Sequence, residues 1–291
     1  MPGAAMPHRR FSHPEDAKWH VQNAVKRYEK TFGRKPDGMW PSEGSVSEDI
    51  LPIIAESGIK WIATDENILF RSLDRQRSAE PMYKPYLLKR HNAELNIIFR
   101  DHGLSDAVGF VYQNVPAPHA VNDFISHIHR IRERLQRHKG GSFLIPVILD
   151  GENAWEYYPN NGRDFLSLLY LRLSEEAPLI QTTTVRDFLS NNPPRDELKR
   201  LFPGSWINAD FSIWIGQDEK NTSWDCLSKT RADLVDFQKK HPELLDSRIL
   251  ADAWREIYIA EGSDWNWWYG PPNTSANDEE FDRIYRAHLL T

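Results

Sequence analysis

Apolar positions along the chain follow two alternating periods, one typical of buried strands and one typical of helices. Short β-branched and aromatic runs predict strands at residues 37–40, 59–64, 96–100, 142–149, 179–185 and 212–216. Helical spacing predicts helices at residues 14–32, 48–57, 121–137, 165–175, 221–241, 247–259 and 277–290. Strands that alternate with helices favour an α/β fold built on a mostly parallel sheet or barrel.

The last third of the chain has a different pattern, because its apolar positions recur only at helical spacing. We therefore expect two regions. Residues 1–216 form a partial (β/α) barrel that carries the catalytic residues, and residues 217–291 form a helical segment packed on the barrel that completes a binding cleft.

Charge and cysteine content narrow the class of protein. The 291 residues carry a formal charge of -6, so no strongly basic surface is available for nucleic acid or for an anionic membrane. The single Cys226 can form neither an internal disulfide nor a thiolate metal site. The first residues also hold no apolar run of the length that a secretory signal needs. A cytoplasmic setting is expected, and no residue pattern specifies an oligomeric state.

Aromatic residues are abundant, and they concentrate in the second half. Of the 11 tryptophans, eight follow residue 150. Large flat rings can stack on the apolar faces of sugars, but they also fill protein cores. Both interpretations stay open on composition alone.

Acidic residues follow two of the predicted strands. Asp150 and Glu152 come directly after the run 142–149, and Glu43 lies three residues after Trp40. The carboxyl ends of strands line the active sites of parallel α/β proteins, where partial burial can raise the pKa of a carboxyl group. Taken singly, each acid is better explained by a polar turn or loop, whereas two acids at two strand ends together favour a site.

A third cluster, AEGSDWNWWYG at residues 260–270, places Glu261 and Asp264 among three tryptophans. Such a group suits a sugar platform with carboxylates that bind hydroxyls. A buried aromatic plug is the alternative.

The segments GMWPSEGS, DGENAW and AEGSDWNWWYG resemble the third, fourth and fifth motifs of glycoside hydrolase family 57, a family of retaining enzymes on α-glucans. FRDHGLSDAVGF and FPGSWINADFSIWIGQDEKN are similar to segments of its amylase-like members. The resemblance extends over nearly the whole chain from about residue 12. It implies an incomplete (β/α)7-type barrel followed by a helical segment.

The resemblance also implies roles for individual residues. Glu43 matches the nucleophile and Asp150 the general acid/base of a double displacement on an α-glucan or maltooligosaccharide. Residues that match the substrate-binding positions of the motifs are Trp40, Trp155, Asp264, Trp265, Trp267 and Trp268. This chemistry needs no metal or cofactor, and no residue distinguishes hydrolysis from transfer to a sugar acceptor.

The first two motifs of the family, beginning with a His-Gln-Pro segment, are absent from this chain. We therefore expect either a truncated enzyme, one part of a split gene, or a remnant that binds carbohydrate without turnover. A metal-dependent polysaccharide deacetylase is a further alternative, but it needs an Asp and two His at one site. His127 and His129 lie two apart on a predicted helix and so face different directions.

Overall fold

The chain divides into two compact units, which are described separately. The structure is a computed structural model and describes residues 5–90, 92–138, 141–151, 155–271 and 273–291. We call Pro36–Ala209 the barrel unit, and we call the combination of Met1–Lys35 with Asp210–Thr291 the helical unit. In this grouping the N-terminal helix belongs with the C-terminal helices.

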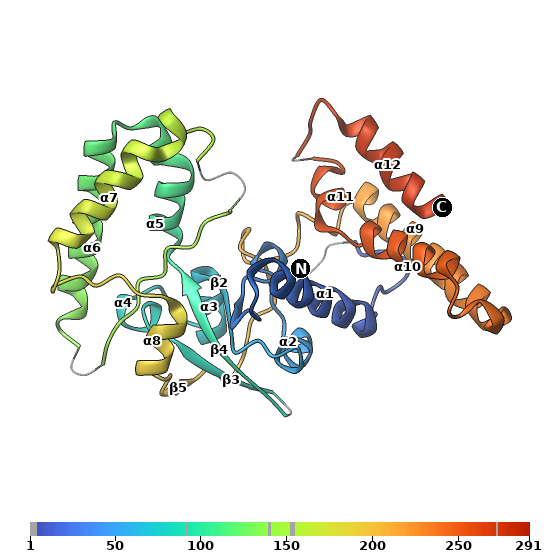
Figure 1. Ribbon diagram of the computed structural model, residues 1–291, viewed down its shortest axis with the longest axis horizontal. Helices are drawn as coiled ribbons and strands as arrows, with labels where there is room; N and C mark the ends of the chain where they lie inside the picture. The colour runs from blue at the N-terminus through green and yellow to red at the C-terminus, as the bar shows by residue number, and fades with distance from the viewer. Residues whose placement is uncertain (1–4, 91, 139–140, 152–154, 272) are drawn as a thin grey trace. The chain divides into compact units, whose positions relative to one another are not determined.

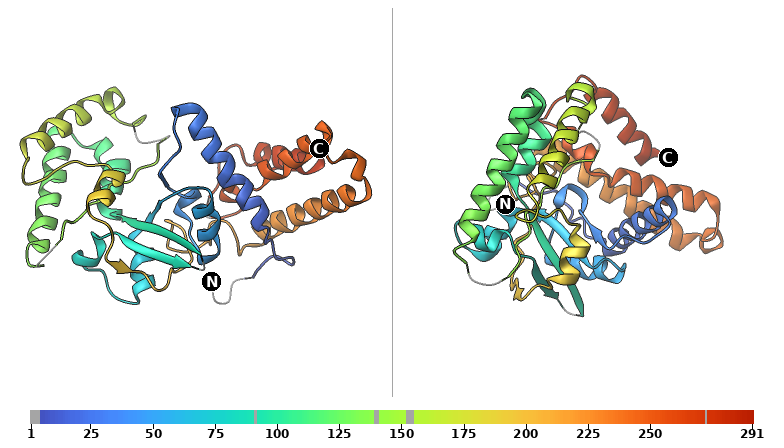
Figure 2. Two further views of the ribbon diagram at one scale, coloured as in Figure 1. Left: turned by 60° about the horizontal axis from the view of Figure 1, so that its bottom comes forward. Right: turned by 60° about the vertical axis from the view of Figure 1, so that its left-hand side comes forward.

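The barrel unit is built on a five-stranded sheet with the order β1-β2-β4-β3-β5 (Figure 1). Its strands are β1 (Gly38–Met39), β2 (Trp61–Asp65), β3 (Tyr86–Arg90), β4 (Ala93–Arg100) and β5 (Asp196–Glu197). The pairs β1–β2, β2–β4 and β3–β5 are parallel, and β3–β4 is an antiparallel hairpin. Figure 2 shows the same sheet from two further sides. The α/β class expected from the sequence is confirmed.

The helices of the barrel unit are α2 (Leu51–Glu56), α3 (Glu66–Leu73), α4 (Ala79–Met82), α5 (His102–Asp106), α6 (Ala117–Leu135), α7 (Arg163–Glu175) and α8 (Val185–Asn191). Of these, α2 and α3 pack on the sheet, and α6 and α7 pack on each other. α6 turns an apolar face, including Val121, Phe124 and Ile128, into the core, and it lies beside α7 (Figure 1).

The acids at the strand ends also start helices. The Asp65 carboxylate accepts a hydrogen bond from the N–H of Asn67 and caps α3, and the Asp101 carboxylate accepts one from the N–H of Leu104 and caps α5. An acidic residue at the end of β2 and another directly after β4 are therefore fixed by the helices that they begin.

Three of the predicted strands are correct and three are wrong. The ranges 37–40, 59–64 and 96–100 overlap β1, β2 and β4, but 142–149, 179–185 and 212–216 form no strand. In the first of these segments Pro146 has no N–H to donate to a ladder. In the second, residues 181–184 are exposed and Thr184 caps α8. The third is a series of turns.

The helical unit consists of α1 (Pro14–Phe32), α9 (Asp218–Lys240), α10 (Arg248–Ala260), α11 (Ser263–Trp268) and α12 (Asp278–Leu290). The long helices predicted here are confirmed. The core contains Leu227, Ile257, Ala260 and Tyr285. α1 joins it through Trp19, whose ring stacks on Tyr258 at 3.8 Å between centroids. Among the residues described, none of the helices has the length and apolar character to cross a membrane.

Candidate active site

Glu43 lies on a tight turn directly after β1, within Ser42–Gly44. Its backbone is left-handed, with φ 56° and ψ 26°, a conformation that costs a non-glycine residue free energy. Trp206 fixes the turn twice. Its backbone N–H donates to the Glu43 carbonyl at 3.1 Å, and its indole Nε1 donates to Glu43 Oε2 at 3.0 Å. The turn and the indole together determine where the carboxylate lies.

Gly44 brings Trp40 into the same place. Gly44 is buried with φ 56°, and a Cβ at this position would lie 2.7 Å from Cζ2 of the Trp40 ring. Its carbonyl accepts a 2.6 Å hydrogen bond from Thr64 Oγ1 on β2. Only glycine combines this backbone with such close approach of a ring.

Asp150 ends an extended segment that lies along the carboxyl end of β4. The Pro146 carbonyl accepts from the N–H of Asp101 at 2.9 Å. The N–H of Ile148 donates to Ser105 Oγ at 3.0 Å, and the Ile148 carbonyl accepts from Arg100 Nε at 3.0 Å. Asp150, half-buried, follows two residues later. Glu152 lies outside the described residues.

These elements surround one pocket. Its lining residues are Trp40, Arg100, Ser105, Gly109, Phe110, Ile148, Leu149, Asp150 and Trp206. Glu43 bonds to Trp206, a wall of this pocket, so the structure brings Glu43, Asp150 and Trp40 to one site. Two aromatic rings, one exposed phenyl ring, a carboxylate and a cation suit a neutral, hydroxyl-rich ligand.

A buried charge network supports the strand ends beside the pocket. Arg100 pairs with Asp65 at 3.1 Å and with Asp106, and His102 lies within 3.1 Å of Asp65 and 2.9 Å of Asp106. Asp65 and Arg100 are 0% and 3% exposed. Buried charges of this kind are stable only when paired and hydrogen-bonded.

A second group of the network lies one residue farther along each strand. Arg77 pairs with Glu66 at 2.7 Å, and the Tyr83 hydroxyl donates to Asp101 at 2.5 Å. Burial raises the pKa of the Glu66 carboxyl, although Arg77 opposes the shift. Burial, with the Asp101 carboxylate, also raises the pKa of Tyr83.

Two residues that line the pocket, Arg100 and Trp206, are not among the site residues predicted from the sequence. Both lie in segments that resemble the family, yet no local period marks them. The position of Arg100 at the end of a predicted buried strand was the available signal for it. Trp206 reaches Glu43 only through the tertiary fold.

Trp155 is not among the residues that line the described pocket. Its ring lies 5.4 Å from Tyr158 and 6.4 Å from Phe165 between centroids, and a Cβ on Gly162 would lie 2.7 Å from it. Its substrate contact stays a prediction.

The remaining predicted residues lie together on α11 of the helical unit. Asp264 is exposed. Trp265 donates from Nε1 to the Ile259 carbonyl at 2.8 Å and packs against Phe281, Tyr285 and His288. Trp267 contacts Trp214, and Trp268 contacts Phe281. Trp265 thus belongs to the core of its unit, and sugar binding by these residues stays a prediction.

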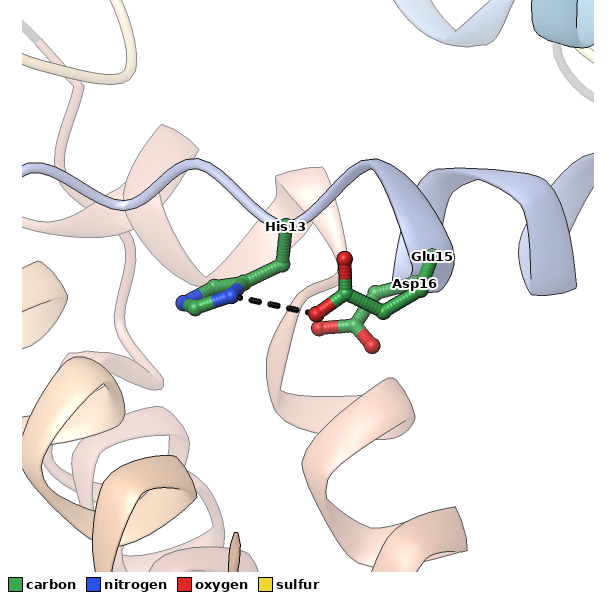
Figure 3. A group of neighbouring side chains, drawn as sticks. All are labelled: His13, Glu15 and Asp16. Carbon is green, nitrogen blue, oxygen red and sulfur yellow. Dashed lines mark ion pairs between the residues drawn. The ribbon is translucent and has the colours of Figure 1, made fainter.

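One group among the described residues has the spacing of a metal site, and Figure 3 shows its members, His13, Glu15 and Asp16. Both carboxylates already have a cationic partner. Arg231 donates to Asp16 at 2.5 Å and 2.8 Å and to Glu15 at 2.7 Å. A metal ion would have to displace this guanidinium, so the group is best described as an ion-pair cluster.

Comparison with solved structures shows the same fold in glucan-active proteins. A GH57 branching enzyme from Thermococcus kodakaraensis matches with a TM-score of 0.79, 18% identity and coverage of 96% of this chain and 62% of that chain. A GH57-type branching enzyme from Pyrococcus horikoshii matches with a TM-score of 0.78 and 20% identity, over 96% of this chain and 60% of that chain. The α-amylase AmyC from Thermotoga maritima matches with a TM-score of 0.75 and 15% identity, over 95% of this chain and 62% of that chain. This chain spans about three fifths of each.

These matches confirm the expected fold, an incomplete (β/α)7-type barrel followed by a helical segment. Comparison with curated protein sequences gives no match. The sequence model of glycosyl hydrolase family 57 matches residues 9–200, about two thirds of the chain, including β1 to β5 and the whole pocket segment around Asp150. The chain therefore belongs to glycosyl hydrolase family 57.

Proposed function

We propose that the chain is a retaining α-glucan hydrolase or glucanotransferase, with Glu43 as nucleophile and Asp150 as general acid/base. The observation that carries the proposal is the position of Glu43, whose carboxylate accepts from Trp206 Nε1 at 3.0 Å while Trp206 and Asp150 line one pocket. Family membership and the parallel-strand architecture support it.

The chemistry needs two carboxylates with different tasks. Glu43 attacks the anomeric carbon and forms a glycosyl-enzyme bond, while Asp150 donates its proton to the departing glycosidic oxygen. Asp150 then accepts a proton from water or from a sugar hydroxyl, which cleaves the glycosyl bond to Glu43 and restores both groups. The anomeric configuration is retained because each of the two displacements at the anomeric carbon inverts it.

The attacking carboxylate must be ionised and fixed in direction. The indole N–H of Trp206 donates to Glu43 Oε2 and so favours the ionised form. The left-handed backbone at Glu43 adds to this fixation, since strain is retained where the surrounding structure demands one geometry.

The substrate class rests on the relatives. Their printed names include branching enzyme, α-amylase and 4-α-glucanotransferase, which supports an α-glucan substrate and leaves water or a sugar hydroxyl as acceptor. Phe110, 43% exposed at the pocket, provides an apolar surface for a sugar ring.

The test compares wild type with Glu43→Gln and Asp150→Asn on amylose and maltooligosaccharides. Proton NMR follows the anomer that forms first, and reducing ends measure turnover. We expect α-anomeric product from wild type, and a fall in turnover of at least roughly 10³-fold in each variant. Glu94→Gln, at the opposite end of β4, is the control and should keep wild-type turnover.

Three outcomes contradict the proposal. Near-normal turnover in Glu43→Gln or Asp150→Asn removes that residue from its role. A β-anomeric first product contradicts retention. Saturable maltooligosaccharide binding without product from the wild-type chain identifies a carbohydrate-binding protein instead.

A further inference from the structure

Arg100 is the last residue of β4, and its guanidinium lines the pocket although the residue is only 3% exposed. A guanidinium offers five N–H donors in one plane and cannot lose its charge in a protein. Three groups accept from it. These are the Ile148 carbonyl at 3.0 Å from Nε, Asp65 Oδ2 at 3.1 Å from Nη1, and Asp106 from Nη2.

One contact of Arg100 is with the segment that carries Asp150. The segment 142–150 is not a strand, but two separate backbone hydrogen bonds hold it, from the N–H of Leu144 to the Tyr83 carbonyl and from the N–H of Asp101 to the Pro146 carbonyl. Ile148 is also fixed at both polar groups, because Ser105 Oγ accepts from its N–H and Arg100 donates to its carbonyl. Asp150 is two residues away, so these two side-chain bonds help to set where its side chain begins.

A different contact leads to Glu43. The guanidinium carbon lies 5.1 Å from the centre of the Trp206 ring, within the range of a cation–π interaction. The same ring donates from Nε1 to Glu43 Oε2 at 3.0 Å. A cation over the indole face restrains the ring and withdraws electron density from it, which makes the N–H a better donor.

The acidic partners hold the guanidinium in place for both contacts. Asp65 is fully buried, and it also has hydrogen bonds with Asn67 and with the His102 ring. His102 lies between Asp65 and Asp106, with one ring nitrogen within 3.1 Å of each. The plane of Arg100 is therefore set by Asp65 and Asp106, which are not among the lining residues of the described pocket.

We propose that Arg100 is a positioning residue that aligns both carboxylates of the proposed pair, Asp150 through the Ile148 carbonyl and Glu43 through the Trp206 ring. The inference rests on the proposed function of Glu43 and Asp150 and deepens it. Lysine cannot replace arginine here, because a single ammonium cannot at once donate to three acceptors in a plane and lie flat over an indole.

The helical unit supplies a matched control, Arg231. It is 5% exposed, pairs with two carboxylates, and lies 5.2 Å from the centre of the Trp254 ring. Arg100→Lys and Arg231→Lys therefore make the same chemical change in similar buried surroundings. Only the first changes a contact with the neighbours of Glu43 and Asp150.

The first measurement is steady-state kinetics on maltooligosaccharides with protein that retains the wild-type circular dichroism spectrum. We expect Arg100→Lys to lower kcat on the order of 10²-fold, as a displacement of about 1 Å does, with little change in KM. Arg231→Lys should keep wild-type kcat. Wild-type kcat in Arg100→Lys, or an equal fall in Arg231→Lys, overturns the proposal.

The second measurement does not depend on turnover. In protein labelled with nitrogen-15 at the indoles, Trp206→Phe identifies the Trp206 Nε1–H signal by its loss. Arg100→Lys should shift that signal toward the position of unbonded indoles, and Arg231→Lys should leave it unmoved. An unmoved signal in Arg100→Lys refutes the link to Glu43. Normal turnover in Glu43→Gln would instead refute the proposed function, while the indole signal still tests the geometry.

If Arg100→Lys does not fold, Asp106→Asn takes its place, because the Asp106 side chain is 31% exposed and its loss frees only one edge of the guanidinium. We then expect a fall in kcat of several-fold and a smaller displacement of the Trp206 signal. If neither changes in Asp106→Asn, the proposal is wrong.

Discussion

Trp206 and Glu43 lie 163 positions apart in the sequence and are joined by two hydrogen bonds, one between backbones at 3.1 Å and one from the indole to the carboxylate at 3.0 Å. The backbone bond fixes the turn, and the indole bond fixes the side chain. Because the second bond is to a charged group in a partly buried site, its loss should affect Glu43 more than it affects the fold.

Trp206→Phe keeps an aromatic ring under Arg100 but removes the indole N–H. A hydrogen bond to a charged group contributes about 1.5–3 kcal/mol, so we expect kcat on maltooligosaccharides to fall roughly 10- to 100-fold. Steady-state kinetics on folded protein checks this. Trp61→Phe is the control, because Trp61 is also a partly buried tryptophan whose Nε1 has no partner in the described structure. If both variants lower kcat equally, the bond to Glu43 has no special role.

Phe110 lies on a π-helical turn, Ala107–Val111, at the pocket and is 43% exposed. If its ring stacks on sugar, Phe110→Ala should lose about 1 kcal/mol of binding and raise KM roughly fivefold, with kcat and thermal stability nearly unchanged. Calorimetric binding of maltooligosaccharides to the Asp150→Asn protein measures the effect directly. Val111→Ala, the neighbouring exposed residue outside the pocket, should bind as the parent does.

Gly44 tests the close approach of the Trp40 ring. In Gly44→Ala the new Cβ would lie 2.7 Å from the ring and the backbone would stay left-handed, so we expect a loss of roughly 2–4 kcal/mol in the free energy of unfolding. Gly58→Ala has a similar left-handed backbone, φ 88°, with no atom within 4 Å, and should lose only about 1 kcal/mol. Urea unfolding measures the free energy of unfolding of both variants. Equal losses in the two would show that the Trp40 ring moves away from the new Cβ without lowering stability.

Local pattern predicted the longest helices, in which apolar positions recur at one period over several turns, but not short ones such as α3 and α5. α1 is the clearest example, since its predicted and observed bounds coincide at Pro14–Phe32. The segment 142–149 shows where pattern fails. Its β-branched residues favour a strand, but Pro146 lacks a donor and the segment bonds to Ser105 and Arg100 side chains instead.

The candidate site was predicted in part. Glu43, Asp150 and Trp40 were named from their motifs; Trp40 and Asp150 line one pocket, and Glu43 accepts a hydrogen bond from Trp206, which also lines it. Arg100 and Trp206 were not named, because their contribution is a set of long-range contacts that no spacing in the sequence encodes. For Trp265 the motif left a sugar platform and an aromatic plug open; its ring packs against the helical core, and its contact with sugar stays a prediction.

Glu261 gives the helical unit a pH dependence that can be worked out in sign. Its side chain is 7% exposed, and burial raises its pKa above 4.5 even though His20, 2.7 Å away, opposes the shift; the nearby Asp16 carboxylate adds to it. The folded protein therefore holds this proton more tightly than the unfolded chain does. The stability that results is present below about pH 4.5 and is lost as the pH rises through the folded pKa.

Glu261→Gln cannot ionise, yet it keeps a hydrogen-bonding group near His20. We expect the wild type to lose stability relative to Glu261→Gln as the pH rises above 4.5, by at most about 1.4 kcal/mol per pH unit, until Glu261 is fully ionised. Urea unfolding at constant ionic strength between pH 4 and pH 8 gives the difference. Glu279→Gln, an exposed acid on α12, should follow the wild type throughout. If the free energy of unfolding of Glu261→Gln falls relative to that of the wild type as the pH rises, the bond to His20 outweighs burial. Glu261 then stabilises the fold as a carboxylate.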